Sequence, residues 1–158
     1  MNARILIVDD HEVLREGLKS LLARSRPDWV ICGEAADGTQ AIQFAQELKP
    51  DLIILDITMP GMSGLEASSR MRKLGLSVPV LIFTMHQSDR LEAEVRNAGA
   101  QGYVLKSQAG RNLVHAIDAL LAGGTFFGPS SKPEPAGGDK PKRGALFRQS
   151  LTLAPDPA

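Results

Sequence analysis

Short apolar runs alternate with segments of helical periodicity from residue 5 to residue 121, and this alternation constrains the fold more than any other feature of the sequence. Each run has the length of a strand and is followed by apolar residues repeating at the spacing of one helical face. The predicted strands are residues 5–8, 29–34, 52–55, 78–83 and 103–105. Repeated strand-helix units predict an α/β fold with a parallel sheet. Residues 52–55 are apolar throughout, as a strand covered on both faces should be, so we place them at the sheet centre.

Local signals predict where the intervening helices begin and end. Asp37 is expected to cap the second helix, and Ser63 with Glu66 has the spacing of a capping box at the start of the third. A fourth helix is expected over about residues 89–98, ending at Gly99, and a fifth is expected to end at the pair Gly123-Gly124. The apolar face predicted for the first helix consists of Val13, Leu14, Leu18, Leu21 and Leu22.

The composition sets broad limits on function. The chain has 158 residues, which suits one cored domain plus an appendage. Lys+Arg and Asp+Glu are equal at 18 each, so the average charge indicates neither nucleic acid nor a membrane surface as a partner. No apolar run is long enough to cross a membrane, and the N-terminus lacks a secretory signal, so we expect a cytoplasmic protein. The lone Cys32 is expected to be a buried, inert thiol.

The composition changes abruptly after Gly128, where Pro, Gly, Ser, Lys and Ala dominate. Such a segment buries too little apolar surface to order itself, so residues 128–158 are predicted to be a disordered linker or tail. Direct nucleic-acid binding through Lys140, Lys142 and Arg143 is one reading of this tail, but so short a charge run is ordinarily solvated. We therefore divide the chain into a folded domain, residues 1–127, and the tail.

Polar side chains follow four of the predicted strands. Asp9 and Asp10 follow the first strand, Asp56 the third, Thr84 the fourth and Lys106 the fifth. Parallel strands present their carboxyl ends at one edge, where such sheets bind ligands. Three carboxylates there repel unless a cation neutralises them, and Mg2+ suits a site with few carboxylates and open positions for phosphate oxygens. This pattern predicts an aspartate nucleophile for phosphoryl transfer, with a lysine cation and a hydroxyl donor beside it.

Four segments, in this order and at this spacing, resemble the receiver domain of two-component response regulators. The resemblance covers about residues 4–125 and implies a doubly wound (βα)5, flavodoxin-like fold with five parallel strands in the order 2-1-3-4-5. It also implies a signalling domain rather than an enzyme. The segments are Ile5 to Asp10, Leu52 to Gly64, Phe83-Thr84 and Gly102 to Lys106.

The resemblance implies a role for each residue of the predicted site. Asp56 would accept a phosphoryl group from a sensor histidine kinase. Asp10, Asp56 and the backbone carbonyl of Thr58 would bind Mg2+, the only cofactor implied, and Asp9 would act on it through water. Lys106 would contact the phosphoryl group.

Further residues match the family's switch and tuning positions. Thr84 and Tyr103 correspond to the switch pair, although Tyr103 also fits a plain strand aromatic. Thr58 and His86 lie two residues beyond Asp56 and Thr84, where the family tunes phosphoryl lifetime; His86 equally fits an exposed loop residue.

A subgroup is indicated by residues 10–18, 102–107 and 123–125, which resemble receivers with a LuxR-type helix-turn-helix output. His11 and His115 are expected to be surface residues. Ser107 replaces the proline that often follows the lysine, so the loop carrying Lys106 lacks that constraint. Residues 128–158 are too few and too proline-rich for a DNA-reading module, so we expect DNA contact only through an output domain absent from this chain. A natural single-domain receiver and a regulator cut in its linker both remain open, as does a homodimer formed on phosphorylation.

Two other functions share features with these residues. A haloacid-dehalogenase-type phosphatase also uses Mg2+ and an aspartate after a strand, but it needs a second aspartate where Thr58 stands. An FMN-binding flavodoxin needs a phosphate loop after the first strand, where Asp9 and Asp10 would repel a phosphate. Both readings fit the sequence less well than a phosphoacceptor does.

Overall fold

A parallel sheet of six strands forms the centre of the computed structural model, which describes residues 2–127. The strand order is β2-β1-β3-β4-β5-β6. The strands are β1 (Arg4–Val8), β2 (Val30–Ala35), β3 (Leu52–Leu55), β4 (Val80–Thr84), β5 (Gly102–Leu105) and β6 (Phe126–Phe127). The helices are α1 (Glu12–Ser25), α2 (Gly38–Leu48), α3 (Gly64–Lys73), α4 (Leu91–Asn97) and α5 (Ala109–Leu121), with a 3-10 turn η1 (Lys106–Gln108) before α5. The predicted class and the order 2-1-3-4-5 are confirmed.

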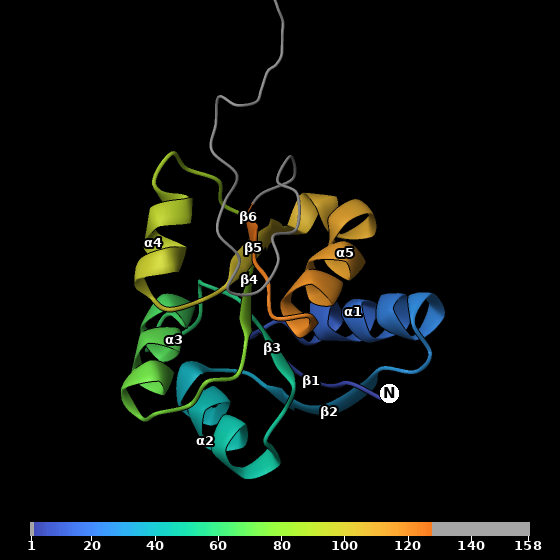
Figure 1. The fold of residues 1–158 in the computed structure, drawn as a ribbon, viewed down its shortest axis with the longest axis horizontal. Coiled ribbons are helices and arrows are strands. Elements are labelled where there is room, and N and C mark those ends of the chain that lie inside the picture. Colours follow the sequence, from blue (N-terminus) through green and yellow to red (C-terminus); the bar gives the residue numbers. More distant parts are fainter. Residues whose placement is uncertain (1, 128–158) are drawn as a thin grey trace, which may run out of the picture.

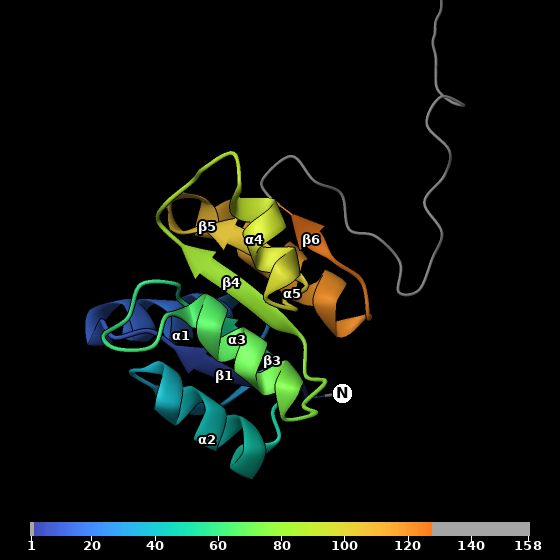
Figure 2. The ribbon, with the colours of Figure 1, turned by 90° about the vertical axis from the view of Figure 1, so that its left-hand side faces the viewer.

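Helices cover both faces of the sheet (Figure 1). Helices α1 and α5 lie on one face, and α2, α3 and α4 lie on the other, which faces the viewer in Figure 2. Alternate residues of each strand enter opposite cores, because successive strand side chains point to opposite faces. In β1, Leu6 packs under α2 and α3 while Ile7 packs under α1 and α5. All four residues of β3 are buried, which accounts for its unbroken apolar run.

The predicted helix signals operate as expected at several ends. The Asp37 carboxylate accepts the backbone N–H of Gln40 at 2.8 Å, and the Ser63 hydroxyl accepts that of Glu66 at 3.1 Å. Gly99 and Gly123 have φ of 78° and 88°, the left-handed conformation that closes a helix. In a full capping box, the Glu66 side chain would also accept the backbone N–H of Ser63. The Glu66 carboxylate instead pairs with Arg70 at 2.7 Å.

Four sequence expectations need correction. Val13 does not belong to the buried face of α1, because it is 85% exposed. Cys32 is half-buried rather than fully buried, although burial does raise the pKa of its thiol. Helix α4 begins at Leu91, later than predicted. A sixth strand, β6, was not predicted: it pairs in parallel with β5 and buries both of its phenylalanines.

The predictions for the tail and for membrane spans can be compared with the structure only over residues 2–127. The predicted tail, residues 128–158, lies outside them, so its disorder and its lack of an output domain stay predictions. Within residues 2–127, no helix is long and apolar enough to cross a membrane.

Candidate functional site

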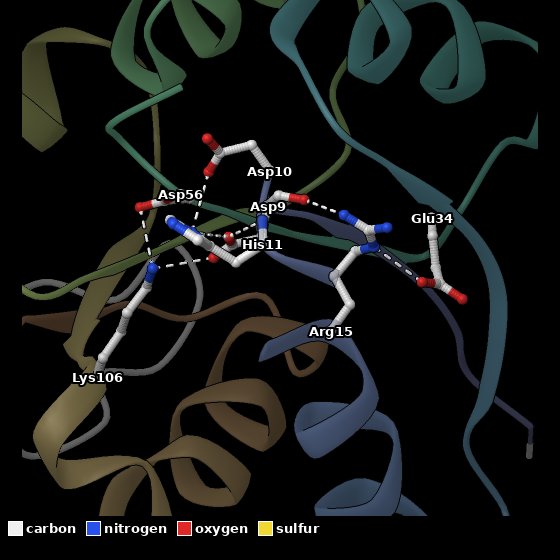
Figure 3. A network of polar contacts seen from close by, with 7 residues as sticks. All are labelled: Asp9, Asp10, His11, Arg15, Glu34, Asp56 and Lys106. Carbon is white, nitrogen blue, oxygen red and sulfur yellow. Dashed lines mark hydrogen bonds and ion pairs between the residues drawn. The ribbon is translucent and has the colours of Figure 1, made fainter. Parts of the chain in front are cut away.

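The carboxyl edge of the sheet brings three charged side chains from distant parts of the chain into contact (Figure 3). Asp9 follows β1, Asp56 follows β3, and Lys106 opens the 3-10 turn after β5. The Lys106 Nζ donates to Asp9 Oδ2 at 2.9 Å and lies 3.4 Å from Asp56 Oδ1. Pairing of β1 with β3 puts Val8 opposite Leu55, so the two aspartates leave the sheet at the same level. One ammonium group thus bridges two carboxylates.

The residues at this edge have the donor chemistry of a divalent cation site. Asp9 is 1% exposed and Asp56 is 3% exposed. Asp10 Oδ1 is buried and makes no hydrogen bond among the described residues, although His11 Nδ1 lies 3.1 Å away. One ligand atom each from Asp9, Asp10, His11 and Asp56 lies within 4.8 Å of the others. Because clustered, buried carboxylates repel one another and a buried oxygen without a hydrogen bond is costly, this set fits a hard cation such as Mg2+.

The Asp56 carboxyl has a raised pKa. Burial is the largest cause and the negative charge of Asp9 the second, while Lys106 and the backbone of Thr58 oppose the rise. Folding therefore brings together like charges that a single lysine only partly compensates. A bound cation would relieve the same repulsion.

This raised pKa predicts how stability depends on pH. The folded state binds the Asp56 proton more tightly than the unfolded state, so the ionised carboxylate destabilises the fold above its folded-state pKa. In metal-free buffer near neutral pH, we expect Asp56→Asn to raise the free energy of unfolding, because it removes the buried charge that Asp9 repels. The difference between the two proteins should shrink as the pH falls and Asp56 takes up a proton. Urea unfolding of both proteins across the acidic range checks this, and a difference that grows toward acid pH would contradict it.

The remaining predicted site residues lie around this cluster. Thr84 is buried at the end of β4, and its hydroxyl accepts the backbone N–H of His86 at 3.2 Å. Thr58 and His86 themselves are exposed on the loops that follow β3 and β4. Tyr103 is buried in β5, with its ring edge-to-face to Phe127 at a centroid distance of 6.3 Å. Its burial, and then Glu92, raise the pKa of its hydroxyl.

Ser107 follows Lys106 within the 3-10 turn that leads into α5. No peptide bond in residues 2–127 is cis. The turn itself, rather than a proline, carries Lys106 to the acidic cluster.

A second layer of charges lies behind Asp9 and was not predicted from the sequence. The Arg15 guanidinium, on α1, donates to the backbone carbonyl of Asp9 and, through Nε, to Glu34 Oε1 at 2.9 Å (Figure 3). Glu34 also accepts from Lys19 at 2.7 Å, and these two cations hold the pKa of Glu34 below its usual range. The sequence does contain a signal for this pairing, because Glu34 lies within a predicted strand and a partly buried charge there needs a partner of opposite charge. Together these residues tie α1 and β2 to the end of β1.

His11 was expected at the surface, and its side chain is 69% exposed. Its ring is nevertheless turned toward the cluster, with Nδ1 3.2 Å from Asp9 Oδ1 and 3.1 Å from Asp10 Oδ1. His115 is exposed on α5, as expected.

Gly64 provides the space in which Asp56 sits. It begins α3, and its N–H donates to the Ile57 carbonyl at 2.8 Å. A Cβ at this position would lie 2.0 Å from the backbone oxygen of Asp56. The third helix can approach the acidic cluster only because this residue has no side chain.

A family model, described as the response regulator receiver domain, matches residues 5–118. The chain belongs to the response regulator receiver family. This receiver is a signalling domain rather than a metabolic enzyme, and the sequence prediction of the family is confirmed.

Similar proteins support the predicted subgroup. The transcriptional regulatory protein YdfI of Bacillus subtilis is 42% identical over 126 residues, covering 80% of this chain and 58% of YdfI. The nitrate/nitrite response regulator NarL of Escherichia coli is 37% identical, covering 97% of this chain and 70% of NarL. The chain thus spans only part of the length of these curated relatives.

Solved structures agree with the fold and the subgroup. A crystal structure of a two-component response regulator of the LuxR family, from Aurantimonas sp., is 41% identical with a TM-score of 0.76, covering 80% of this chain and 89% of that one. The isolated receiver domain of RcsB from Salmonella enterica, in the presence of a phosphomimetic, is 26% identical with a TM-score of 0.73, covering 82% and 95%. The receiver resembles those of LuxR-family regulators, as its sequence predicts.

Proposed function

We propose that Asp56 accepts a phosphoryl group from the phosphohistidine of a sensor histidine kinase and that Mg2+ assists this transfer. The observation that carries the proposal is the buried Asp56 carboxylate held 3.4 Å from the Lys106 ammonium and beside the Asp9 carboxylate. Such a group is shielded from bulk water yet lies at the open edge of the sheet where ligands bind. Membership of the receiver family supports the same role.

The transfer needs little covalent machinery. A carboxylate oxygen of Asp56 forms a bond to phosphorus while the phosphorus–nitrogen bond to the donor imidazole breaks, and the electron pair stays on that nitrogen. Lys106 Nζ, which now bridges Asp9 and Asp56, is placed to move onto a phosphoryl oxygen. Positioning and charge neutralisation are therefore what the protein supplies.

The cation would be held by Asp10, Asp56 and the backbone carbonyl of Thr58, with Asp9 acting through water. When bound, Mg2+ would neutralise the carboxylates and the oxygens of the transferring group. The Asp10 Oδ1 atom supports this assignment, because it is buried without a hydrogen bond and is free to accept a metal ion.

An apolar groove beside the cluster offers a docking surface for the phosphodonor. It has a volume of about 430 Å³ and lies where Met85 and Val13 are strongly exposed. Exposed apolar side chains gathered in one place mark interaction sites. We infer that the donor histidine reaches Asp56 across this groove, which is lined by His11, Val13, Leu14, Gly17, Met85 and Lys106.

Phosphorylation would be read by Thr84 and Tyr103. The Tyr103 ring contacts Phe127, and the Arg96 guanidinium lies 3.8 Å from the centroid of that Phe127 ring. A movement of Tyr103 would therefore disturb both α4 and β6, through which the chain leaves the described domain. The output we propose is transcription control, as the name of YdfI suggests. We propose that it acts through a homodimer and a DNA-binding domain outside this chain, since a solved structure of the similar RcsB is described as two dimers bound to DNA. This role implies a cytoplasmic location.

Intact-protein mass spectrometry tests the proposal. Incubated with a small phosphodonor and Mg2+, the protein should gain the mass of one phosphoryl group. Chelation of divalent ions with EDTA should abolish the gain, and added Mg2+ should restore it, because the clustered carboxylates would otherwise repel the donor. An undiminished gain in the presence of EDTA would overturn the role of the cation.

A further inference from the structure

We propose that His11 joins Asp10 and Asp56 as a ligand when the site holds Zn2+, and that its imidazole gives the site affinity for Zn2+ beyond that of an all-oxygen site. The inference rests on the proposed function, because it takes the same acidic cluster as the cation site. It goes beyond that function by assigning a nitrogen ligand and a metal preference.

The orientation of the His11 ring carries the inference. His11 occupies the N-cap position of α1, but its side chain makes no capping hydrogen bond. The ring instead turns toward the two aspartates, with Nδ1 3.2 Å from Asp9 Oδ1 and 3.1 Å from Asp10 Oδ1 (Figure 3). The backbone N–H of His11 also donates to Asp9 Oδ1 at 2.9 Å, which fixes the residue relative to the cluster. The ring nitrogen therefore converges on the atoms that would ligate a cation.

The distances suit a shared ion. One ligand atom from each of Asp9, Asp10, His11 and Asp56 lies within 4.8 Å of the others. An ion bonded at about 2.0–2.2 Å to nitrogen and oxygen separates opposite ligands by about twice that length, so only a small closure is needed. Asp10 Oδ1 is buried without a hydrogen bond and lies 3.1 Å from His11 Nδ1, so these two atoms would be neighbouring ligands of the ion.

The chemical type of the ligands determines which metal ion the site prefers. Carboxylates, carbonyls and water suit Mg2+, whereas an imidazole nitrogen suits Zn2+ and its neighbours in the transition series. Removing the ring should therefore affect the two metals unequally. The exposed position of His11 makes its substitution harmless to the core.

Isothermal titration calorimetry with MgCl2 alone and with ZnCl2 alone tests the inference on the purified chain. His11→Ala should weaken Zn2+ binding by at least about 10- to 100-fold, which is the cost of losing a group that only orients a ligand, and leave Mg2+ binding unchanged. His115→Ala is the matched control, because His115 is exposed on α5 and outside the cluster. It should change neither affinity. In NMR spectra, the ring protons of His11 should shift with Zn2+ at the same stoichiometry.

The possible results separate the two proposals. Equal Zn2+ affinity of wild type and His11→Ala overturns the ligand role of His11. An equal loss of both metals overturns it as well, because the ring would then act only by orienting the aspartates. If His11→Ala selectively loses Zn2+ but the wild type takes no phosphoryl group from any donor, the ligand role stands and the phosphoacceptor function fails.

Discussion

Asp56→Asn should abolish phosphoryl incorporation completely, which is the largest functional effect expected of a single substitution in this chain. Asparagine keeps the shape of the side chain, but its amide is a poor nucleophile and cannot form the acyl phosphate. The folded structure should persist, because the substitution removes a buried charge that is repelled by Asp9. Intact-protein mass spectrometry after incubation with Mg2+ and a small phosphodonor measures the effect.

Asp28→Asn serves as the matched control for this prediction. Asp28 is an exposed aspartate near the start of β2, and its contact is a 3.5 Å ion pair with Arg26. The control variant should gain one phosphoryl group as the wild type does. A gain that persists in Asp56→Asn would show that another residue is the acceptor.

Much of the fold was predictable because its signals are local. An unbroken apolar run such as Leu52–Leu55 is typical of a strand covered on both faces, and the helical segments on either side of it favour a parallel sheet. The charged residues of the cluster were predictable for a related reason, since Asp9, Asp56 and Lys106 each follow a strand end and parallel strands share an edge. Their roles in phosphoryl transfer stay predictions of the family resemblance.

The features that were missed depend on contacts between distant segments. β6 has two residues, Phe126 and Phe127, so it shows no periodicity, and it exists because β5 offers it a free edge. The pair of Arg15 with Glu34 joins α1 to β2, and its formation depends on how that helix lies against that strand. Helical spacing correctly predicted that Leu18 and Leu22 lie on the buried face of α1. It did not predict where that face ends, and Val13 projects into solvent.

Gly64→Ala should destabilise the protein strongly, although alanine is ordinarily the better helix former. The added Cβ would lie 2.0 Å from the backbone oxygen of Asp56 and 2.8 Å from its carbonyl carbon, and neither atom belongs to a flexible side chain that could turn away. The backbone of the phosphoacceptor or the start of α3 must shift. We expect a loss of about 3 kcal/mol or more in the free energy of unfolding, at the upper end of overpacking effects. Urea denaturation followed by circular dichroism measures it.

Gly17→Ala makes the same chemical change as Gly64→Ala but should stabilise the protein. Gly17 lies within α1 and is exposed, and a Cβ added there would meet no atom within 4 Å outside its own stretch of the helix. Alanine there should raise the free energy of unfolding by about 0.5–1 kcal/mol, because it restricts the unfolded chain and favours the helix. The contrast between the two variants isolates the contact with Asp56 from general helix propensity. If both variants were equally stable, the close approach of α3 to the phosphoacceptor would not be what fixes the geometry of the site.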